Sequence, residues 1–381
     1  MSKTGDTRRD FIKTVGLAAA AVTTGAVGGR AAQHEPPSME EGFFIRREEL
    51  TLKFQQEAGA RRLSFGNFAG SPETWKKACR GKLAELIGFS KPTPRPARML
   101  RSIEYEGVTV QAWLMEVSPS LSLPAYVLLP ASPTSRERAV MAIQGHGEVE
   151  PCIGPHDDYH HRFALRLARA GHLVLCPALR GFGPLGDMAF GDNQRCLDYW
   201  ISSRGHQFTL VTDAFLYGRT LIGQTVEDLL RWEDWLCDAR SVRTVDVAGI
   251  SYGGDVALTY PAFSDRVGKI YASGSLGSFS PICSRCYNAP AHCIPGILQW
   301  MDRSDIAGLN APRPIRLHYG ERDTPGPTNN SASYNETVEP SLVELRAIYK
   351  AFGADEHVSL HVTPKTGHEM DNKDLAAFLA G

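Results

Sequence analysis

Short apolar and β-branched runs alternate with amphipathic segments along most of the chain after about residue 138. Short runs of this kind are typical of parallel strands that are buried on both faces. We expect strands at residues 139–144, 172–176, 244–250, 269–272, 315–319 and 358–362. Between and after these strands apolar positions recur at helical spacing, which predicts helices at residues 158–170, 224–238, 340–352 and 371–379.

Three further strand-like runs precede this region, at residues 101–105, 108–117 and 125–129. Short polar turns separate them, which is typical of an antiparallel meander. Strands that alternate with helices after such a meander predict an α/β fold. We expect a doubly wound, mostly parallel sheet with antiparallel strands at one edge, preceded by an N-terminal helical segment.

That N-terminal segment covers residues 33–97. Residues 71–73 (Ser-Pro-Glu) have the pattern of a helix cap followed by proline at the first helical position, and Gly88 ends the expected helix. Prolines at 92, 94 and 96 predict a stiff linker. We therefore assign residues 33–97 to a helical segment and linker, and residues 98–381 to the main α/β domain.

The first 32 residues have a different pattern. Residues 7–13 (Thr-Arg-Arg-Asp-Phe-Ile-Lys) match the twin-arginine export pattern, and a weakly hydrophobic stretch rich in Ala, Gly and Thr follows. Small residues at Gly29 and Ala31 suit a signal peptidase. We expect residues 1–32 to be a twin-arginine signal peptide that directs the protein, through the twin-arginine export machinery, to the periplasm or beyond. A basic first turn on a cytosolic helix is the alternative.

Composition and net charge exclude some classes of binding partner. The 381 residues are 43% hydrophobic and 22% charged, with a net charge of −1, so we expect neither nucleic acid nor an anionic membrane as partner. No apolar run is long enough for a membrane span in the mature chain. Cys283, Cys286 and Cys293 lie close together in sequence beside His292. A disulfide or buried thiols are favoured there, and a zinc site is the alternative.

Ser251 is the candidate nucleophile, because it stands between two glycines where a strand gives way to a helix. In such a nucleophile elbow the turn is too tight for side chains at Gly249 and Gly253. It therefore lifts the serine hydroxyl above the carboxyl edge of the sheet. The backbone N–H of Tyr252, at the helix start, points to where a substrate carbonyl oxygen becomes negative.

A serine needs a histidine to accept its proton and a carboxylate to orient that histidine. His368 follows the last expected strand and precedes the last expected helix, which makes it the candidate base. Asp323 follows the strand at residues 315–319 and is the candidate acid, with Glu321 in reserve. The simpler interpretation of the other histidines is that they are structural or solvent-exposed polar residues. They are His156, His160, His161, His357 and His361.

The second oxyanion donor is expected in residues 144–147 (Gln-Gly-His-Gly), which follow the first parallel strand. We assign it to the backbone N–H of His146, since flanking glycines let a substrate approach closely. A plain glycine turn is the alternative. The acid and base follow the nucleophile in the order Ser251, Asp323, His368, which is the order expected for this architecture.

These motifs resemble those of the α/β-hydrolase superfamily, within it the acetyl-xylan-esterase-like and dienelactone-hydrolase-like bacterial esterases. The resemblance runs from about residue 101 to the end and also rests on residues 180–183, 217–220, 293–296 and 311–314. Two departures matter. Gln144 stands where such proteins often have histidine, and true dienelactone hydrolases use a cysteine nucleophile.

The resemblance implies a serine hydrolase but does not imply xylan as the substrate. Together with the export pattern it leads us to expect an exported enzyme that cleaves carboxylic esters, acetylated sugars being one candidate class, with neither metal nor organic cofactor. A serine peptidase of the prolyl-oligopeptidase kind is an alternative, although residues 33–97 are too few for its propeller. A catalytically inactive binding protein on the same fold and a zinc protein are the others. Aromatic residues expected to line a substrate pocket or to pack in the core are Phe190, Tyr199, Trp200 and Trp300.

Overall fold

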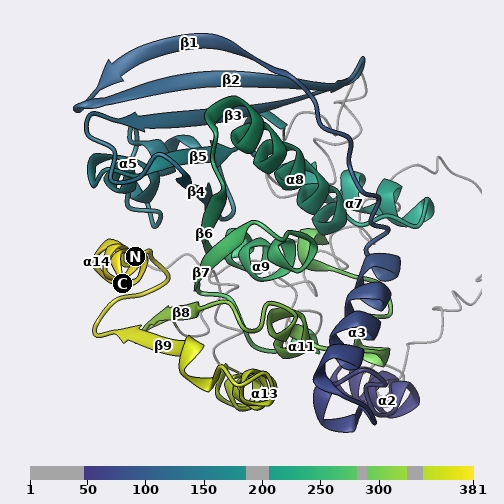
Figure 1. Cartoon of the computed structure of the whole chain (residues 1–381). Helices are drawn as coiled ribbons and strands as arrows, with labels where there is room; N and C mark the ends of the chain where they lie inside the picture. Colours follow the sequence, from purple (N-terminus) through teal and green to yellow (C-terminus); the bar gives the residue numbers. More distant parts are fainter. Residues whose placement is uncertain (1–46, 186–205, 281–289, 324–337) are drawn as a thin grey trace, which may run out of the picture. The chain divides into compact units, whose positions relative to one another are not determined.

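Nine strands form one sheet in the order β1-β2-β3-β5-β4-β6-β7-β8-β9 (Figure 1). The pairs β1–β2, β2–β3 and β3–β5 are antiparallel, and the other five pairs are parallel. Their bounds are β1 Ala97–Tyr105, β2 Val108–Ser118, β3 Leu121–Pro130, β4 Arg138–Ile143, β5 Leu173–Pro177, β6 Thr244–Ile250, β7 Val267–Ser273, β8 Ile315–Gly320 and β9 Val358–Thr363. The expected mostly parallel sheet with an antiparallel edge is confirmed.

The computed structural model describes residues 47–185, 206–280, 290–323 and 338–381. The chain from Arg47 to Gly381 clusters as one compact unit, which includes the expected helical segment from residue 47 onward. Several sequence-based expectations lie outside the described residues. They are the signal peptide, Cys283, Cys286, Phe190, Tyr199 and Trp200.

Helices cover both faces of the sheet (Figure 1). On one face lie α4 (Glu150–Ile153), α5 (Phe163–Arg169) and α14 (Asn372–Ala380). The larger cluster on the other face includes residues of α3 (Pro72–Leu86), α7 (His206–Leu216), α8 (Leu221–Arg240), α9 (Tyr252–Thr259), α11 (Arg303–Gly308) and α13 (Val338–Ala351). Strand β4 supplies both clusters alternately: Val140 and Ala142 face the first, and Met141 and Ile143 face the second. This alternation is why the strand is apolar throughout.

Helix α3 begins as its sequence predicts. The Ser71 side chain accepts a hydrogen bond from the Thr74 N–H at 3.2 Å, and Pro72 occupies the first turn. The helix buries Trp75, Cys79 and Leu83, which recur at the four-residue spacing of one helical face. These residues join the main core, so the N-terminal segment from α2 (Arg47–Ala58) onward belongs structurally with the sheet.

The helix expected at residues 158–170 begins only at Phe163. Residues 158–162 instead form a turn, in which the His161 N–H donates to the Asp158 carbonyl at 3.0 Å. His161 and Arg162 have φ values of 50° and 56°, and left-handed residues cannot continue a right-handed helix. The apolar spacing alone could not reveal this turn, which places several side chains beside the candidate site.

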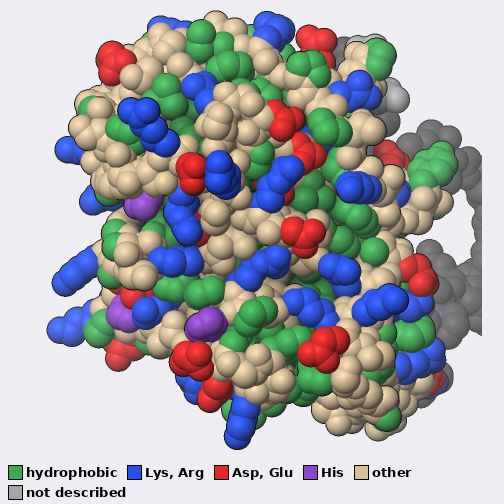
Figure 2. Space-filling model, in the orientation of Figure 1, with side chains coloured by type: hydrophobic (Ala, Val, Ile, Leu, Met, Phe, Trp, Pro, Cys, Tyr) green, Lys and Arg blue, Asp and Glu red, His purple; other side chains and the backbone are tan. Residues whose placement is uncertain are grey.

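Surface charge is mixed on the face shown in Figure 2, where basic and acidic side chains are interspersed. This distribution fits the near-zero net charge of the chain. Among the described residues, no helix combines the length and the apolar character that crossing a membrane requires.

Candidate active site

Ser251 sits in a strained turn between β6 and α9. Its φ and ψ are 59° and −124°, a conformation that non-glycine residues rarely adopt. A methyl group at Gly249 would overlap the Gly253 carbonyl, and one at Gly253 would overlap the carbonyls of Ile143 and Gln144. The two glycines are therefore required by close backbone approach, as the elbow pattern predicts.

His368 and Asp323 lie together on neighbouring loops. His368 Nδ1 is 3.1 Å from Asp323 Oδ2, and the Asp323 side chain is 1% exposed. The two loops are tied directly, because the Arg322 N–H donates to the Thr366 carbonyl at 2.8 Å. Glu321, the reserve acid, instead accepts the Lys365 N–H at 2.7 Å and remains at the surface.

Ser251 and His368 pack against the same dipeptide, Ser273–Gly274. The Ser251 N–H donates to the Ser273 carbonyl at 2.9 Å, and a methyl at Gly274 would lie 2.5 Å from His368 Cε1. His368 Nε2 is buried and has no hydrogen-bond partner within the described parts of the chain. The Ser251 hydroxyl is 3.4 Å from the Nδ1 of a second histidine, His146. In this structure the Ser251 hydroxyl therefore has the His146 imidazole at the long limit of hydrogen-bond distance, and His368 Nε2 accepts no hydrogen bond from it.

Both residues expected to supply oxyanion donors, His146 and Tyr252, belong to segments that adjoin Ser251. Tyr252 is the first residue of α9, and the first N–H groups of a helix have no acceptor within it. His146 follows β4 in a loop whose Gly145 would, with a methyl group, come within 2.9 Å of Ser251 Cβ. Gln144 is buried and its side chain donates to the Gly147 carbonyl at 3.3 Å. The glutamine thus braces this loop.

A buried ionic cluster, which the sequence analysis missed, lies on the first turn of the helix that follows Ser251. Asp255, one turn beyond Ser251, forms a bidentate ion pair with Arg303 and a hydrogen bond with His292. Burial lowers the pKa of His292 to about 3, so its ring is neutral. That ring lies 5.3 Å from the His146 ring, between centroids. The spacing of residues 251 and 255 on one helical face was the available signal; the partners are distant in sequence.

His318, also missed, joins the ends of three strands beneath the acid and base loops. Its Nδ1 is 2.8 Å from Ser273 Oγ on β7, and its Nε2 is 2.9 Å from Thr363 Oγ1 on β9. Burial lowers the pKa of His318 to about 4, which keeps it neutral near pH 7. A neutral imidazole has one donor and one acceptor, so it links two hydroxyl groups without adding charge.

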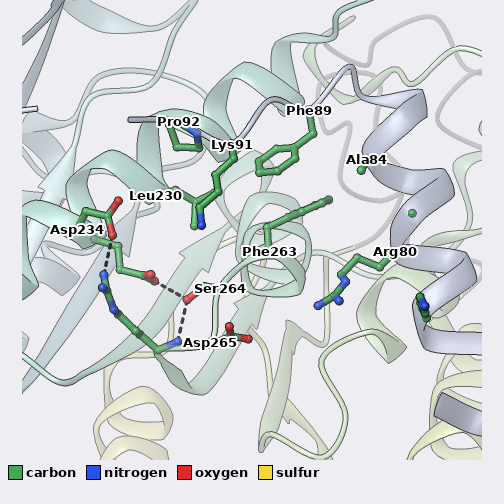
Figure 3. Close-up of a pocket in the computed structure, with 14 residues that line it drawn as sticks. Arg80, Ala84, Phe89, Lys91, Pro92, Leu230, Asp234, Phe263, Ser264 and Asp265 are labelled. Atoms are coloured by element: carbon green, nitrogen blue, oxygen red, sulfur yellow. Dashed lines mark hydrogen bonds and ion pairs between the residues drawn. The ribbon is translucent and has the colours of Figure 1, made fainter. Parts of the chain in front are cut away.

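No group of three His, Cys, Asp or Glu side chains in the described residues is arranged to hold a metal ion. A separate pocket of about 700 Å³ is shown in Figure 3, where Phe89 and Phe263 stack with their centroids 4.4 Å apart. Its wall includes Asp265 and Arg266, which precede β7, whereas Ser251 follows β6. Because these strands are parallel, the pocket lies at the amino ends of the strands, and Ser251 lies at their carboxyl ends.

No protein-family model and no curated protein matches the sequence. Solved structures do match it. A Bacteroides fragilis protein named for acetyl xylan esterase activity is 17% identical, with a TM-score of 0.65 over 86% of this chain and 84% of its own. A glucuronoyl esterase from Solibacter usitatus is 11% identical, with a TM-score of 0.59 over 82% and 93%.

A third solved structure, a carbohydrate esterase family 15 glucuronoyl esterase from Teredinibacter turnerae, is 13% identical, with a TM-score of 0.56 over 86% of this chain and 89% of its own. At such identities a structural likeness establishes the fold. The chain has the α/β-hydrolase fold, as its motifs indicated.

Proposed function

We propose that this α/β-hydrolase-fold chain is a serine ester hydrolase with Ser251 as nucleophile, His368 as base and Asp323 as the acid. The observation that carries the proposal is the strained, positive-φ serine in a glycine-flanked elbow. Backbone strain at a nucleophile is maintained where the surrounding structure over-determines it and is typical of functional sites. The pairing of His368 with buried Asp323 supports the same assignment.

The chemistry follows from the atoms present. Ser251 Oγ attacks the ester carbonyl carbon while His368 Nε2 accepts its proton, and Asp323 holds the Nδ1–H and stabilises the imidazolium. The N–H groups of His146 and Tyr252 donate to the oxyanion. His368 then protonates the leaving alcohol, and the resulting acyl-enzyme is hydrolysed by a water molecule that the same ring activates.

One rearrangement is required before attack. In this structure the serine hydroxyl lies nearer His146 Nδ1, at 3.4 Å, while His368 Nε2 is without a partner among the described residues. Rotation about χ1 of Ser251 moves only one oxygen atom. Catalytic hydrogen bonds are commonly long in unliganded enzymes and tighten when substrate binds.

We infer carbohydrate esters as the substrate class, because the three solved structures described above are named for acetyl xylan esterase or glucuronoyl esterase activity. A substrate panel tests this inference: acetylated xylo-oligosaccharides, methyl esters of glucuronate, simple acyl esters of increasing length, lactones and amides. Turnover of the sugar esters at the highest kcat/KM supports it. Cleavage of amides alone would refute the esterase assignment and favour a peptidase.

The nucleophile is tested separately with a fluorophosphonate probe, which labels activated serines covalently. We expect the wild-type protein to be labelled and Ser251→Ala to remain unlabelled. Ser359→Ala is the matched control, since Ser359 lies on β9 and its Oγ donates to the Ile315 carbonyl on β8, at 3.4 Å. Equal labelling of wild type and Ser251→Ala would overturn the assignment of the nucleophile.

We also propose that residues 1–32 direct export through the twin-arginine machinery, on the strength of residues 7–13. Replacing Arg8 and Arg9 together by lysine should retain the full-length precursor in the cytoplasm of a bacterial host. Fractionation followed by immunoblotting measures this. Unchanged appearance of the double variant in the periplasm would contradict the proposal.

A further inference from the structure

The turn at residues 158–161 lies between two loops of the candidate site. We call residues 145–147 the oxyanion loop and residues 366–370 the base loop. Figure 1 shows that these loops follow different strands, β4 and β9, which are not neighbours in the sheet. The sheet fixes the ends of these two strands, and the turn adds direct contacts between the loops that follow them.

Tyr159 contacts the oxyanion loop through its hydroxyl. The Tyr159 O–H donates to the His146 carbonyl at 2.6 Å. Burial raises the pKa of Tyr159, so its hydroxyl keeps its proton and stays a donor. A methyl at Gly145 would overlap this hydroxyl and would also lie 2.9 Å from Ser251 Cβ. The loop thus passes closely between the tyrosine and the nucleophile.

His160 contacts the same loop one residue earlier. Its Nε2 accepts the Gly145 N–H at 2.9 Å, and its Nδ1 is 2.7 Å from Asp158 Oδ1. An acceptor at Nε2 requires the proton to be on Nδ1, and the Asp158 carboxylate selects that tautomer. Although burial works against it, the hydrogen bond from His160 lowers the pKa of Asp158 and keeps it ionised. His160 itself is fully buried.

Together these bonds fix the peptide group between them. The Gly145 N–H belongs to the peptide group before the one that carries the His146 N–H, and the His146 carbonyl belongs to the one after it. Because peptide groups are planar, holding both neighbours limits the rotation of the group between them. That group carries one of the two proposed oxyanion donors.

The same turn holds the base loop. The Met370 N–H donates to the Tyr159 carbonyl at 2.9 Å, and the Tyr159 ring stacks on the His368 ring, with centroids 5.4 Å apart and planes at 24°. His161 Nε2 is 2.7 Å from Glu369 Oε2. Tyr159 therefore touches the base with its ring and the oxyanion loop with its hydroxyl.

We propose that Tyr159 and His160 are positioning residues that set the His146 oxyanion donor at a fixed place relative to His368. This inference rests on the proposed ester hydrolysis and deepens it. Neither residue exchanges a proton with the substrate. Their effect is to preorganise the donor, whose stabilisation of the transition state depends on placement before the reaction starts.

Tyr159→Phe tests the hydroxyl alone, because the phenylalanine ring still stacks on His368. We expect kcat for the preferred ester to fall roughly 10- to 100-fold with KM within about threefold of wild type. This loss is smaller than the roughly 100- to 1000-fold loss that follows removal of a whole oxyanion donor. The shape of the kcat–pH profile should match that of the wild type, since the ring that stacks on His368 and the Asp323 carboxylate both remain.

Tyr105→Phe is the matched control. The Tyr105 hydroxyl also donates to a backbone carbonyl, that of Gly154, at 3.1 Å, but it lies on edge strand β1. We expect its kcat to be unchanged. For His160, the pair His160→Gln and His160→Leu separates acceptor from bulk: glutamine retains an acceptor for the Gly145 N–H, and leucine does not. Glutamine should therefore restore part of the activity that leucine loses.

Two further measurements test the positioning role: the affinity for an alkyl boronic acid and the rate of hydrogen exchange at the Gly145 amide. A purely structural role would not change both together. Both the inhibition constant and the exchange rate should rise in His160→Leu. If Tyr159→Phe and His160→Leu both keep the kcat and the boronate affinity of the wild type, the inference is overturned, while ester hydrolysis still stands. If the wild-type protein neither hydrolyses esters nor is labelled at Ser251, the proposed function is refuted instead. In that case unchanged Gly145 exchange in His160→Leu would refute the loop contact as well.

Discussion

Gly274→Ala is expected to move the ring of His368, the proposed base, relative to Asp323, the proposed acid. Gly274 has a φ of +58°, and its N–H donates to the His318 carbonyl at 2.8 Å. An alanine Cβ there would lie 2.5 Å from His368 Cε1, 2.7 Å from His368 Nδ1 and 3.4 Å from Asp323 Oδ2. Ordinary van der Waals contact requires roughly 3.5–4 Å, so the ring must move by about 1 Å.

A displacement of about 1 Å at a catalytic group can lower the rate roughly 100-fold, which corresponds to about 2.7 kcal/mol of activation free energy. The left-handed backbone adds a separate cost to stability of roughly 1–2 kcal/mol for any residue with a Cβ. Gly353→Ala isolates that second effect. Gly353 has a φ of +67°, and a methyl group there would meet nothing within 4 Å.

Initial rates with the preferred ester, normalised to folded protein by circular dichroism, measure the first effect, and urea unfolding measures the second. We expect both variants to lose similar stability and only Gly274→Ala to lose kcat. If Gly274→Ala keeps kcat within about threefold of Gly353→Ala, the packing of His368 against this glycine does not position the base, and the reasoning is wrong.

Three further predictions concern stability. Because burial lowers the pKa of His318 to about 4, against about 6.5 when unfolded, the folded state binds fewer protons between these values. The contribution of His318 to the free energy of unfolding is therefore fully present above pH 6.5 and falls by roughly 3 kcal/mol toward pH 4. Urea unfolding of His318→Gln should accordingly show a flatter pH dependence than that of His357→Gln. Arg303→Met should lower the unfolding free energy by roughly 3–5 kcal/mol, because it leaves the buried Asp255 carboxylate without its ion pair; a loss below about 1 kcal/mol would contradict this. Ser71→Ala removes the cap of α3 and should cost about 1 kcal/mol in the same assay, with no change in kcat.

The sequence was sufficient for the sheet and for the elbow, for physical reasons that are local. Residues 249–253 must form a turn without side chains at two positions, and that requirement appears directly as glycine. His368 and Asp323 could be proposed because the carboxyl ends of parallel strands meet at one edge, which brings their loops together. To predict these two residues it was enough to know that their loops follow β8 and β9; the conformation of the loops was not needed.

The supporting residues could not be predicted in the same way. Asp255 and Arg303 are 48 positions apart, and Tyr159 meets His368 across more than 200 residues. A buried ion pair or ring contact between such positions leaves no periodic signal in the sequence. The turn at residues 158–162 was interpreted as helix because its apolar spacing continues that of α5; two left-handed residues interrupt the helix, and neither is a glycine.

The backbone conformation of Ser251 has a consequence for stability and activity taken together. A chain optimised for stability alone would have glycine at this position, since glycine adopts positive φ without a steric penalty. If Ser251 is the nucleophile, as we propose, serine at this position costs about 1 kcal/mol of stability in exchange for a reactive hydroxyl. Ser251→Gly should accordingly be an inert protein that melts at a higher temperature than the native enzyme, and a suitable form in which to trap an intact ester.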